Sequence, residues 1–288
     1  MTQQSHYYVC EEYGLDYPKT YIYNKGDQTR DFGFMYPVIV KASDSISFFQ
    51  NPFEGMNKAY VAHSEEEFNQ IISDVYSHGY EKSMIIQDFI PGEDDHMRVL
   101  TCYSDQNAKV KMMCLGHVLL EEHTPKGIGN HAAIITEYEE ELMEKYKAFL
   151  EKIGYVGFSN FDIKYDDRDG KFKVFEINLR QGRSNFYVTS SGNNIARYVV
   201  EDRIYNKEMD LKIQKDPFYW HVIPNSVVYG FVKDKSLVKR CKDLVAQGKS
   251  ASSFGYDYDL RGNFKRRLYL FLYGLNQKKK FNKYCKKY

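Results

Sequence analysis

Two alternating segments in the middle of the chain constrain the fold more than any other feature. They are residues 158–165 (FSNFDIKY) and 171–183 (KFKVFEINLRQGR), separated by a five-residue break with three acids and one glycine. In both segments apolar and polar residues alternate, as in strands that are buried on one face only. A three-residue loop over 168–170, with Gly170 in the left-handed conformation, would join them. The sequence therefore predicts an antiparallel β-hairpin with one polar face.

The polar face of this hairpin carries two carboxylates. With a three-residue loop, Asp162 lies opposite Glu176, and Asn160 lies opposite Asn178. Directly opposed Cβ atoms are roughly 4.5–5.5 Å apart, and like charges at that distance repel each other. A bound cation removes this repulsion, and Mg²⁺ takes one or two carboxylates together with substrate phosphates. We therefore predict Asp162, Glu176 and Asn178 as metal ligands; the alternative is the solvated polar face of an edge hairpin.

A second polar signal lies upstream of the hairpin. Residues 36–43 (YPVIVKAS) form a short apolar strand whose end carries Lys41, and residues 44–56 follow as a long flexible loop. A lysine in this place can contact a nucleotide phosphate, but many buried strands also end in a lysine whose ammonium group reaches water. On its own, the pattern is a weak indication of a nucleotide site.

The order of these elements resembles the ATP-grasp superfamily. The shared order is a strand with a phosphate-binding lysine, a mobile loop, a strand that leads into an adenine-binding linker, and paired acids ending in E-x-N-x-R, here residues 176–180. Within the superfamily the chain is similar to the D-aspartate ligases of peptidoglycan synthesis over roughly residues 10–205, but not over residues 206–288. The segments that carry this similarity are CEEYGLDYPKT (10–20), IIQDFIPGEDDHMRVL (85–100), MMCLGHVLLEEHTPKGIGN (112–130) and FSNFDIKYDDRDGKFKVFEINLRQGRSNFYVT (158–189).

The resemblance implies an α+β protein with the ATP-grasp fold, in which two α+β subdomains grip ATP. Residues 1–205 would form this domain, with a small lid subdomain at about 33–90, and residues 206–288 would form a basic, helical C-terminal extension. Members of the superfamily normally have a separate N-terminal α/β domain, which we expect this chain to lack or to obtain from a partner chain. Gln3 occupies the place of a second phosphate-binding lysine.

The resemblance also implies an enzyme. It would be an ADP-forming ligase that uses ATP and Mg²⁺ to join a carboxylic acid to an amine through an acyl phosphate. The acid would be D-aspartate, and the amine would be the lysine side chain of a peptidoglycan precursor. One alternative is a ligase for another amino acid. A second is a truncated or split ATP-grasp module that binds nucleotide but needs a partner domain for turnover.

The nucleotide-binding residues of the family map onto two segments of this chain. Lys41 would contact the α- and β-phosphates, backbone groups of residues 87–90 would bind the adenine, and one acid of residues 93–95 would accept hydrogen bonds from the ribose. Arg98 points to the same region, although a lone arginine on a strand is more often structural. The residues assigned to the nucleotide are Lys41, Gln87, Asp88, Phe89, Ile90, Asp94, Asp95 and Arg98.

The same resemblance implies the catalytic and substrate-binding residues. Arg180 would stabilise the transferring phosphoryl group or a tetrahedral oxyanion, with Lys41 as the second catalytic cation, unless Arg180 instead forms an ion pair with one of the metal-binding acids. Two arginines suit a dicarboxylic acid, because a guanidinium group pairs with a carboxylate through two hydrogen bonds. Nothing in the sequence identifies a general base. The residues assigned to the substrate are Arg180, Arg183, Ser184 and Lys126, the last on a loop at 121–130 whose alternative role is a polar surface.

Composition excludes several classes of protein. The net charge of +1 provides no general attraction to nucleic acid. No apolar run approaches the roughly 20 residues needed to span a bilayer. The five cysteines are scattered and include no CxxC pair, as in proteins whose thiols stay reduced. We therefore expect a cytoplasmic protein that does not bind nucleic acid.

The C-terminal segment differs from the rest of the chain. Residues 261–288 contain ten Lys or Arg residues and no acid, with apolar residues at helical intervals. Such a helix either packs its apolar stripe on the rest of the chain, which we favour, or lies on an anionic membrane surface, here the inner face of the membrane. The apolar positions are Phe264, Leu268, Phe271, Leu272 and Leu275.

Local patterns predict the remaining elements. Ser64 to Glu67 (SEEE) form a capping box, which predicts a helix that ends near Gly79. The other expected elements are strands at 84–89, 97–103 and 109–115 and helices at 137–153 and 194–205.

Overall fold

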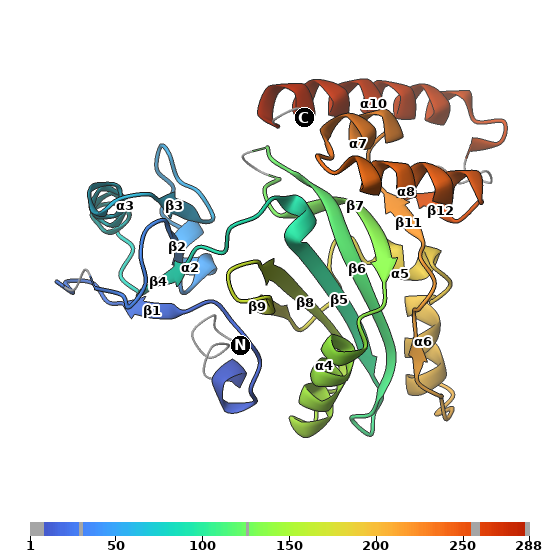
Figure 1. Ribbon diagram of the computed structural model, residues 1–288, viewed down its shortest axis with the longest axis horizontal. Coiled ribbons are helices and arrows are strands. Elements are labelled where there is room, and N and C mark those ends of the chain that lie inside the picture. Colours follow the sequence, from blue (N-terminus) through green and yellow to red (C-terminus); the bar gives the residue numbers. More distant parts are fainter. Residues whose placement is uncertain (1–8, 29–30, 125–126, 255–259, 286–288) are drawn as a thin grey trace. The chain divides into compact units, whose positions relative to one another are not determined.

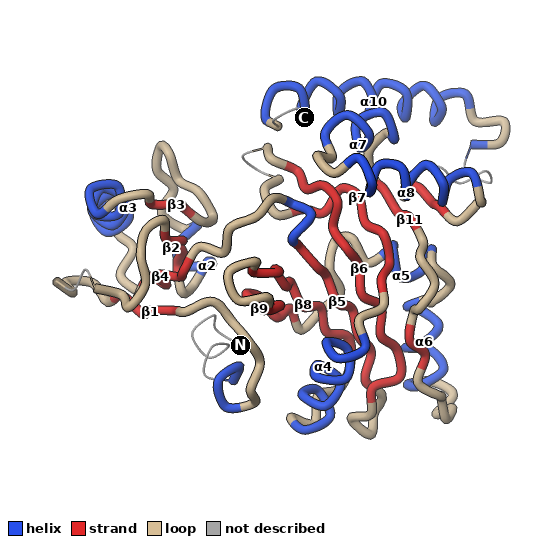
Figure 2. The backbone as a smooth tube through the Cα atoms, viewed as in Figure 1, coloured by secondary structure: helices blue, strands red, loops and turns tan. Residues whose placement is uncertain are grey.

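The computed structural model describes residues 9–28, 31–124, 127–254 and 260–285 (Figure 1). The chain divides into two compact units. The first comprises residues 1–91 and 164–176, and the second comprises residues 92–163 and 177–288. Helices, strands and loops are distinguished in Figure 2, which shows that both units contain helices and a β-sheet.

The first unit is built on a four-stranded antiparallel sheet with strand order β1-β4-β2-β3. Aromatic side chains fill its core; the ring of Phe32 lies 5.1 Å from that of Phe68, and the ring of Phe48 lies 5.5 Å from that of Tyr80. The elements are β1 (Thr20–Tyr23), β2 (Val38–Ala42), α2 (Ser45–Phe49), β3 (Tyr60–Ala62), α3 (Glu65–Ser77) and β4 (Met84–Asp88).

The capping box at Ser64 begins helix α3 as predicted. Ser64 Oγ accepts a hydrogen bond from Glu67 N at 3.3 Å, and Glu67 Oε2 accepts one from His63 N at 2.8 Å. Glu67 therefore reaches the residue before the N-cap rather than the N-cap itself. The loop expected at 44–56 contains helix α2, because the Asp44 side chain accepts hydrogen bonds from two backbone N–H groups and caps it.

The second unit is built on a mixed sheet with strand order β12-β11-β7-β6-β5-β8-β9, and β10 pairs with β6. The hairpin strands β8 and β9 continue into residues of the first unit. The strands are β5 (Met97–Ser104), β6 (Val110–Glu122), β7 (Asn130–Glu137), β8 (Gly157–Asp166), β9 (Lys171–Asn178), β10 (Lys212–Ile213), β11 (Tyr219–His221) and β12 (Ser250–Ser252). The helices are η1 (Asp94–His96), α4 (Glu140–Lys152), α5 (Phe186–Ser190), α6 (Ile195–Arg203), α7 (Asn225–Phe231), α8 (Lys235–Ala246) and α10 (Phe264–Tyr284).

Strand β7 was not predicted, and this changes one predicted helix. The expected helix at 137–153 begins only at Glu140, because Glu137 is the last residue of β7. Residues 132–136 of β7 are all buried, so the strand lacks the alternation that marks a half-buried strand in a sequence. Strands β5 and β6 were both predicted, and they pair antiparallel with Arg98 opposite His117.

The C-terminal segment is part of the second unit. Helices α7, α8 and α10 satisfy the expectation of a helical region, but residues 206–288 also contribute strands β10, β11 and β12. Strand β11 pairs with β7, and side chains of α7, α8 and α10 share a buried cluster with β6 and β7. Within the described ranges, no helix has both the length and the apolar character needed to cross a bilayer. All five cysteines are free thiols, in agreement with the sequence.

The apolar stripe of α10 does not pack on the rest of the described chain. Its five residues are exposed, whereas the side chains of α10 that are buried are Gln277 and Phe281. The favoured expectation for this stripe is therefore wrong. The helix does dock on the second unit, but it uses another face.

A partly buried carboxylate connects four elements of the second unit. Glu137 Oε1 lies 2.7 Å from His117 Nδ1 and accepts a hydrogen bond from Arg240 Nη1 at 3.1 Å, and its Oε2 lies 3.2 Å from Arg98 Nε. Burial by itself would raise the pKa of Glu137, but the His117 hydrogen bond and the two arginines hold it at about 2. The carboxylate thus ties strands β5, β6 and β7 to helix α8.

Replacing this carboxylate should destabilise the protein strongly. Glu137→Gln leaves the largely covered guanidinium group of Arg98 and the half-exposed one of Arg240 without their counter-charge, so we expect the free energy of unfolding to fall by about 1.5–3 kcal/mol. Because the pKa in the folded state is below the ordinary value of 4.5, the contribution of Glu137 is present above pH 4.5 and is lost as the pH falls toward 2. Urea unfolding at several pH values measures both effects. The exposed Glu144→Gln is the control and should cost less than about 1 kcal/mol; equal losses for the two variants would refute the network.

Candidate functional site

Lys41, which was predicted to bind phosphate, and Gln87, the first residue of the predicted adenine linker, are neighbours in the first unit. Lys41 lies on β2, one residue before its end, and β2 pairs antiparallel with β4, which carries Gln87. Lys41 Nζ donates a hydrogen bond to Gln87 Oε1 at 3.2 Å, and Gln87 Nε2 donates one to Thr20 Oγ1 at 3.1 Å. Residues from three strands therefore hold the ammonium group in place.

The electrostatic surroundings of Lys41 suit an anionic ligand. Burial lowers the pKa of Lys41 to about 8, the charge of Glu176 opposes this shift, and the charge of Lys58 adds to it. The predicted metal ligand Glu176 and a second cation, Lys58, are thus within electrostatic range of Lys41. Lys58 was missed by the sequence analysis; its place after the glycine-containing loop at 44–56 was the one available signal.

The side chains of the predicted adenine linker are engaged within the first unit. Arg168, in the hairpin turn, donates to both carboxylate oxygens of Asp88, at 3.1 and 2.8 Å. Lys164 Nζ lies 5.5 Å from the centre of the Phe89 ring, and Ile90 is buried. These contacts agree with the expectation that the linker offers its backbone to a ligand, which stays a prediction.

The turn of the hairpin differs from the predicted one. Four residues, not three, separate β8 from β9, although Gly170 does adopt a left-handed conformation with φ of +69°. The buried Asp166 side chain accepts hydrogen bonds from Arg168 N at 3.0 Å and from Lys173 Nζ at 2.7 Å, and this local turn lengthens the loop. The register deduced from a three-residue loop therefore does not apply at this turn.

Two of the three predicted metal ligands share a face of the hairpin. Asn178 Nδ2 donates a hydrogen bond to Asp162 Oδ2 at 3.3 Å. The described residues contain no group of three or more His, Cys, Asp or Glu side chains arranged around a metal position. Asp162, Asn178 and Glu176 offer carboxylate and amide oxygens, which is the donor set that suits Mg²⁺ when phosphates complete the shell. That these three residues hold a cation together stays a prediction.

A buried polar network supports the segment that follows β9. Thr101 Oγ1 lies 2.9 Å from Asn160 Oδ1 and 3.3 Å from Asn185 Oδ1, and Tyr187 Oη donates to the Cys114 carbonyl at 2.7 Å. Gly182 lies against these amides, because a Cβ added there would be 2.9 Å from Asn185 Oδ1 and 3.0 Å from Asn160 Oδ1. The network fixes the backbone that presents the predicted substrate residues.

The predicted catalytic and substrate arginines are exposed to solvent. Arg180 Nη1 donates to the carbonyl of the next residue, Gln181, at 3.0 Å, and Arg183 is also exposed. Ser184 is instead buried. Lys126 lies outside the described residues, and both ends of the loop predicted at 121–130 belong to strands β6 and β7.

The structure brings a histidine to Ser184 that the sequence analysis missed. His131 Nδ1 lies 3.4 Å from Ser184 Oγ, and His131 Nε2 lies 3.4 Å from Glu121 Oε1. Burial lowers the pKa of His131 to about 4, so the imidazole is neutral at pH 7. The signal was available, since His131 directly follows the GIGN segment that resembles the family, but its pairing with Ser184 spans 53 residues.

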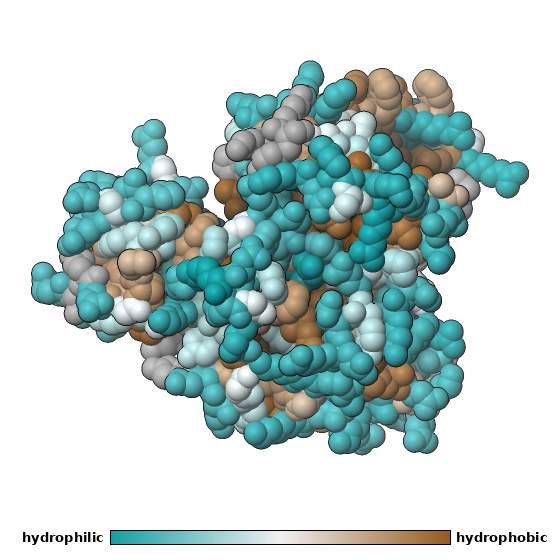
Figure 3. Space-filling view, in the orientation of Figure 1, coloured by the Kyte–Doolittle hydropathy of each residue, from teal (hydrophilic) through white to brown (hydrophobic). Residues whose placement is uncertain are grey.

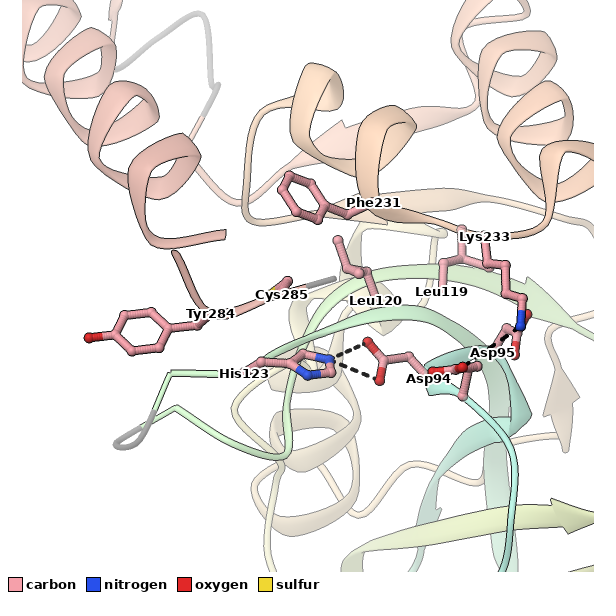
Figure 4. Close-up of a pocket in the computed structure, with 10 residues that line it drawn as sticks. Asp94, Asp95, Leu119, Leu120, His123, Phe231, Lys233, Tyr284 and Cys285 are labelled. Atoms are coloured by element: carbon pink, nitrogen blue, oxygen red, sulfur yellow. Dashed lines mark hydrogen bonds and ion pairs between the residues drawn. The ribbon is translucent and has the colours of Figure 1, made fainter. Parts of the chain in front are cut away.

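The acids predicted to bind ribose line a cavity of about 320 Å³ in the second unit (Figure 4). Asp94 is already engaged there, because Oδ2 accepts from Glu121 N at 2.8 Å and lies 2.8 Å from His123 Nε2. Asp95 Oδ1 lies 2.9 Å from His96 Nδ1. The lining residues are Glu93, Asp94, Asp95, Leu119, Leu120, His123, Phe231, Lys233, Tyr284 and Cys285.

Arg98 is committed to the structure of the second unit. Its Nη1 donates to the carbonyls of Asp95 and Met97, both at 3.0 Å, and its Nε faces Glu137. These contacts match the structural alternative that the sequence left open. A contact of Arg98 with phosphate stays a prediction.

Comparisons with known proteins identify the class by fold. No family model matches the chain. An N5-carboxyaminoimidazole ribonucleotide synthetase in complex with ADP superposes with a TM-score of 0.57 at 14% identity, covering 85% of this chain and 60% of that one. The biotin carboxylase domain of 2-oxoglutarate carboxylase from Hydrogenobacter thermophilus gives 0.57 at 14% identity, with coverages of 76% and 48%. Phosphoribosylamine–glycine ligase from Thermotoga maritima gives 0.51 at 16% identity, with coverages of 76% and 57%. The chain therefore has the ATP-grasp fold, as the sequence predicted.

A sequence comparison leads to a particular relative. The chain is 43% identical over 265 residues to D-aspartate ligase from Enterococcus faecium (strain Aus0004). It is a homologue of that ligase, which confirms the resemblance found in the sequence. The alignment covers 88% of this chain, and the chain spans 63% of the length of the relative.

Filling the space at Gly182 should disturb the site without touching its charged residues. In Gly182→Ala the new methyl group meets two amide oxygens that Thr101 already holds, so we expect the free energy of unfolding to fall by about 1–3 kcal/mol. Urea unfolding measures this change. Gly230→Ala is the matched control, since an added Cβ there meets no atom within 4 Å and alanine favours the helix. A neutral Gly182→Ala variant would contradict the close approach described above.

Proposed function

We propose that this chain is an ATP-dependent, ADP-forming ligase that joins D-aspartate to the lysine side-chain amine of a peptidoglycan precursor. The observation that carries this proposal is the 43% identity to a D-aspartate ligase over 265 residues. The ATP-grasp fold supports the nucleotide part of the reaction, and the placement of Lys41, Gln87 and Glu176 in the first unit agrees with it.

The proposed reaction has two steps. A carboxylate oxygen of the acid attacks the γ-phosphorus of ATP, the bond to the β–γ bridging oxygen breaks, and an acyl phosphate and ADP form. The amine nitrogen then attacks the acyl carbon, phosphate leaves, and the nitrogen loses a proton as the amide forms. In such reactions the protein contributes mainly by positioning the reactants and by neutralising charge on the phosphates.

Lys41 would place its positive charge on the phosphates. Its hydrogen bond to Gln87 orients the ammonium group, and the residues that follow Gln87 would bind the adenine through their backbone. Asp162, Glu176 and Asn178 would hold Mg²⁺, which when bound supplies further positive charge to the phosphate oxygens. The hydrogen bond between Asn178 and Asp162 keeps these two side chains together before any ligand arrives.

The acid substrate would lie at the segment that follows β9. The exposed guanidinium groups of Arg180 and Arg183 can each pair with one carboxylate of aspartate. Ser184 would hydrogen-bond the same substrate, and His131 would act as a positioning residue that sets the direction of the Ser184 hydroxyl. Burial raises the pKa of Tyr273 on α10, the charge of Glu122 raises it further, and the charge of Arg183 lowers it, so Tyr273 lies within electrostatic range of this segment.

The direct test is phosphate release from ATP and Mg²⁺ with D-aspartate, L-aspartate and a lysine-containing precursor peptide. We expect release that requires D-aspartate and the peptide together. Glu176→Gln should lower the rate at least about 100-fold, because it removes a metal-binding charge, whereas the exposed Glu144→Gln should not change it. If ATP binds but no phosphate is released, the chain is a module that needs a further domain. Full activity of Glu176→Gln would refute the assigned metal site.

The lowered pKa of Lys41 predicts how ATP affinity depends on pH. Phosphate favours the charged ammonium, so binding above pH 8 must take up a proton, and the affinity should fall by up to about tenfold per pH unit there. Calorimetric titration in buffers with different ionisation enthalpies measures this uptake. Lys41→Arg keeps its charge over the whole range and should remove the effect of this group. The same proton uptake in both proteins at pH 9 would show that Lys41 does not contact the phosphates.

A further inference from the structure

Helix α10 carries apolar residues on two different sides, and one of these two sides is buried. Gln277 and Phe281 are covered, and the Phe281 ring lies 5.6 Å from the Phe231 ring of α7. A Cβ added at Gly274 would be 3.2 Å from Pro224 Cγ, so the backbone of α10 approaches the start of α7 closely at this point. Figure 1 shows α10 as the outer helix beside α7 in the second unit. One side of the helix is therefore an ordinary packing face.

The other apolar side of α10 faces solvent. We call its five residues, which follow one another at intervals of one, three and four positions, the α10 stripe. At about 100° of rotation per residue the stripe lies on a side roughly opposite to Gln277 and Phe281. Hydrophobic side chains appear on the outer surface over this helix in Figure 3. The exposed fractions are Phe264 76%, Leu268 46%, Phe271 63%, Leu272 54% and Leu275 45%.

Basic residues border the α10 stripe on both sides. By the same rotation, Arg267 and Lys278 lie along one border, and Lys265 and Lys283 lie along the other. Lys279 follows the stripe at its C-terminal end. Residues 261–288 hold ten Lys or Arg residues and no acid, while the whole chain has a net charge of only +1. The positive charge is thus concentrated where the apolar surface is exposed.

This charge pattern discriminates between the surfaces that could cover the stripe. A second copy of the chain, facing the first through the same stripe, would bring two basic helices together with no acid in either segment. An anionic bilayer has the complementary charge and an apolar interior. On such a surface the stripe enters the boundary between headgroups and acyl chains, and the long basic side chains reach back to the lipid phosphates.

We propose that the α10 stripe and its basic borders form a peripheral docking surface for an anionic lipid bilayer. The helix lies in the plane of the membrane and offers about 30 Å of length, at 1.5 Å for each of its 21 residues. It remains attached to the second unit through Phe281 and Gly274, so docking requires no unfolding. The inference is independent of the reaction proposed above, because it concerns a surface and not the chemistry.

The test is co-sedimentation of the full chain with vesicles of phosphatidylcholine alone and of phosphatidylcholine with 30% phosphatidylglycerol. We expect binding to the anionic vesicles only, weakening as salt is raised. Phe271→Ser with Leu275→Ser should lower the partition coefficient at least about tenfold, and Lys278→Gln with Lys279→Gln should lower it on the order of tenfold. Val199→Ser with Val200→Ser, at positions 37% and 40% exposed on α6, is the matched control and should bind normally.

Insertion of the stripe can be read out directly. Phe271→Trp should be quenched by brominated anionic lipid, whereas the single native tryptophan, Trp220, is 2% exposed and should not be quenched. All substituted positions are exposed, so thermal unfolding should be unchanged, and so should phosphate release without vesicles. The proposal fails if anionic vesicles do not bind, if the Phe271/Leu275 variant binds as well as the native chain, or if the introduced tryptophan is not quenched. It also fails if the native chain is a dimer that these two substitutions dissociate.

Discussion

The ion-pair network around the partly buried carboxylate of Glu137 joins four elements of the second unit. A charge inside a sheet is tolerated only when it is paired, and Glu137 is paired by Arg98, His117 and Arg240. Two of these partners also reach the Asp95 carbonyl, Arg98 Nη1 at 3.0 Å and His117 Nε2 at 2.7 Å. The network therefore joins the sheet to helix α8 and at the same time fixes the acid-rich turn at residues 93–95.

Polar contacts fix the site residues of each unit before a ligand binds. In the first unit, Gln87 orients Lys41, and Arg168 bridges the hairpin turn to Asp88. In the second unit, Thr101 holds the amides against which Gly182 packs. Positioning of this kind is what the proposed reaction would require of residues that do no covalent work.

Much of the first unit and of the site follows from local patterns in the sequence. The strand that carries Lys41, the capped helix after Ser64 and the alternation on both sides of Gly170 depend on neighbouring residues only. The remaining features depend on contacts between distant residues. Strand β7 is buried by its partners on both sides, and His131 meets Ser184 across 53 residues, so no local pattern marks either of them.

By itself, the sequence determined the order of most elements and, through its resemblance to the ATP-grasp superfamily, the fold class. The order depends on periodicity and the resemblance depends on motif residues, and the sequence contains both directly. Only the tertiary structure decided that Glu137 ends a strand and becomes the centre of an ion-pair network, and that α10 packs through Phe281. Each of these outcomes depends on contacts between residues that are far apart in the sequence. Such contacts are determined by which surfaces the rest of the chain brings together, and that is a property of the whole fold.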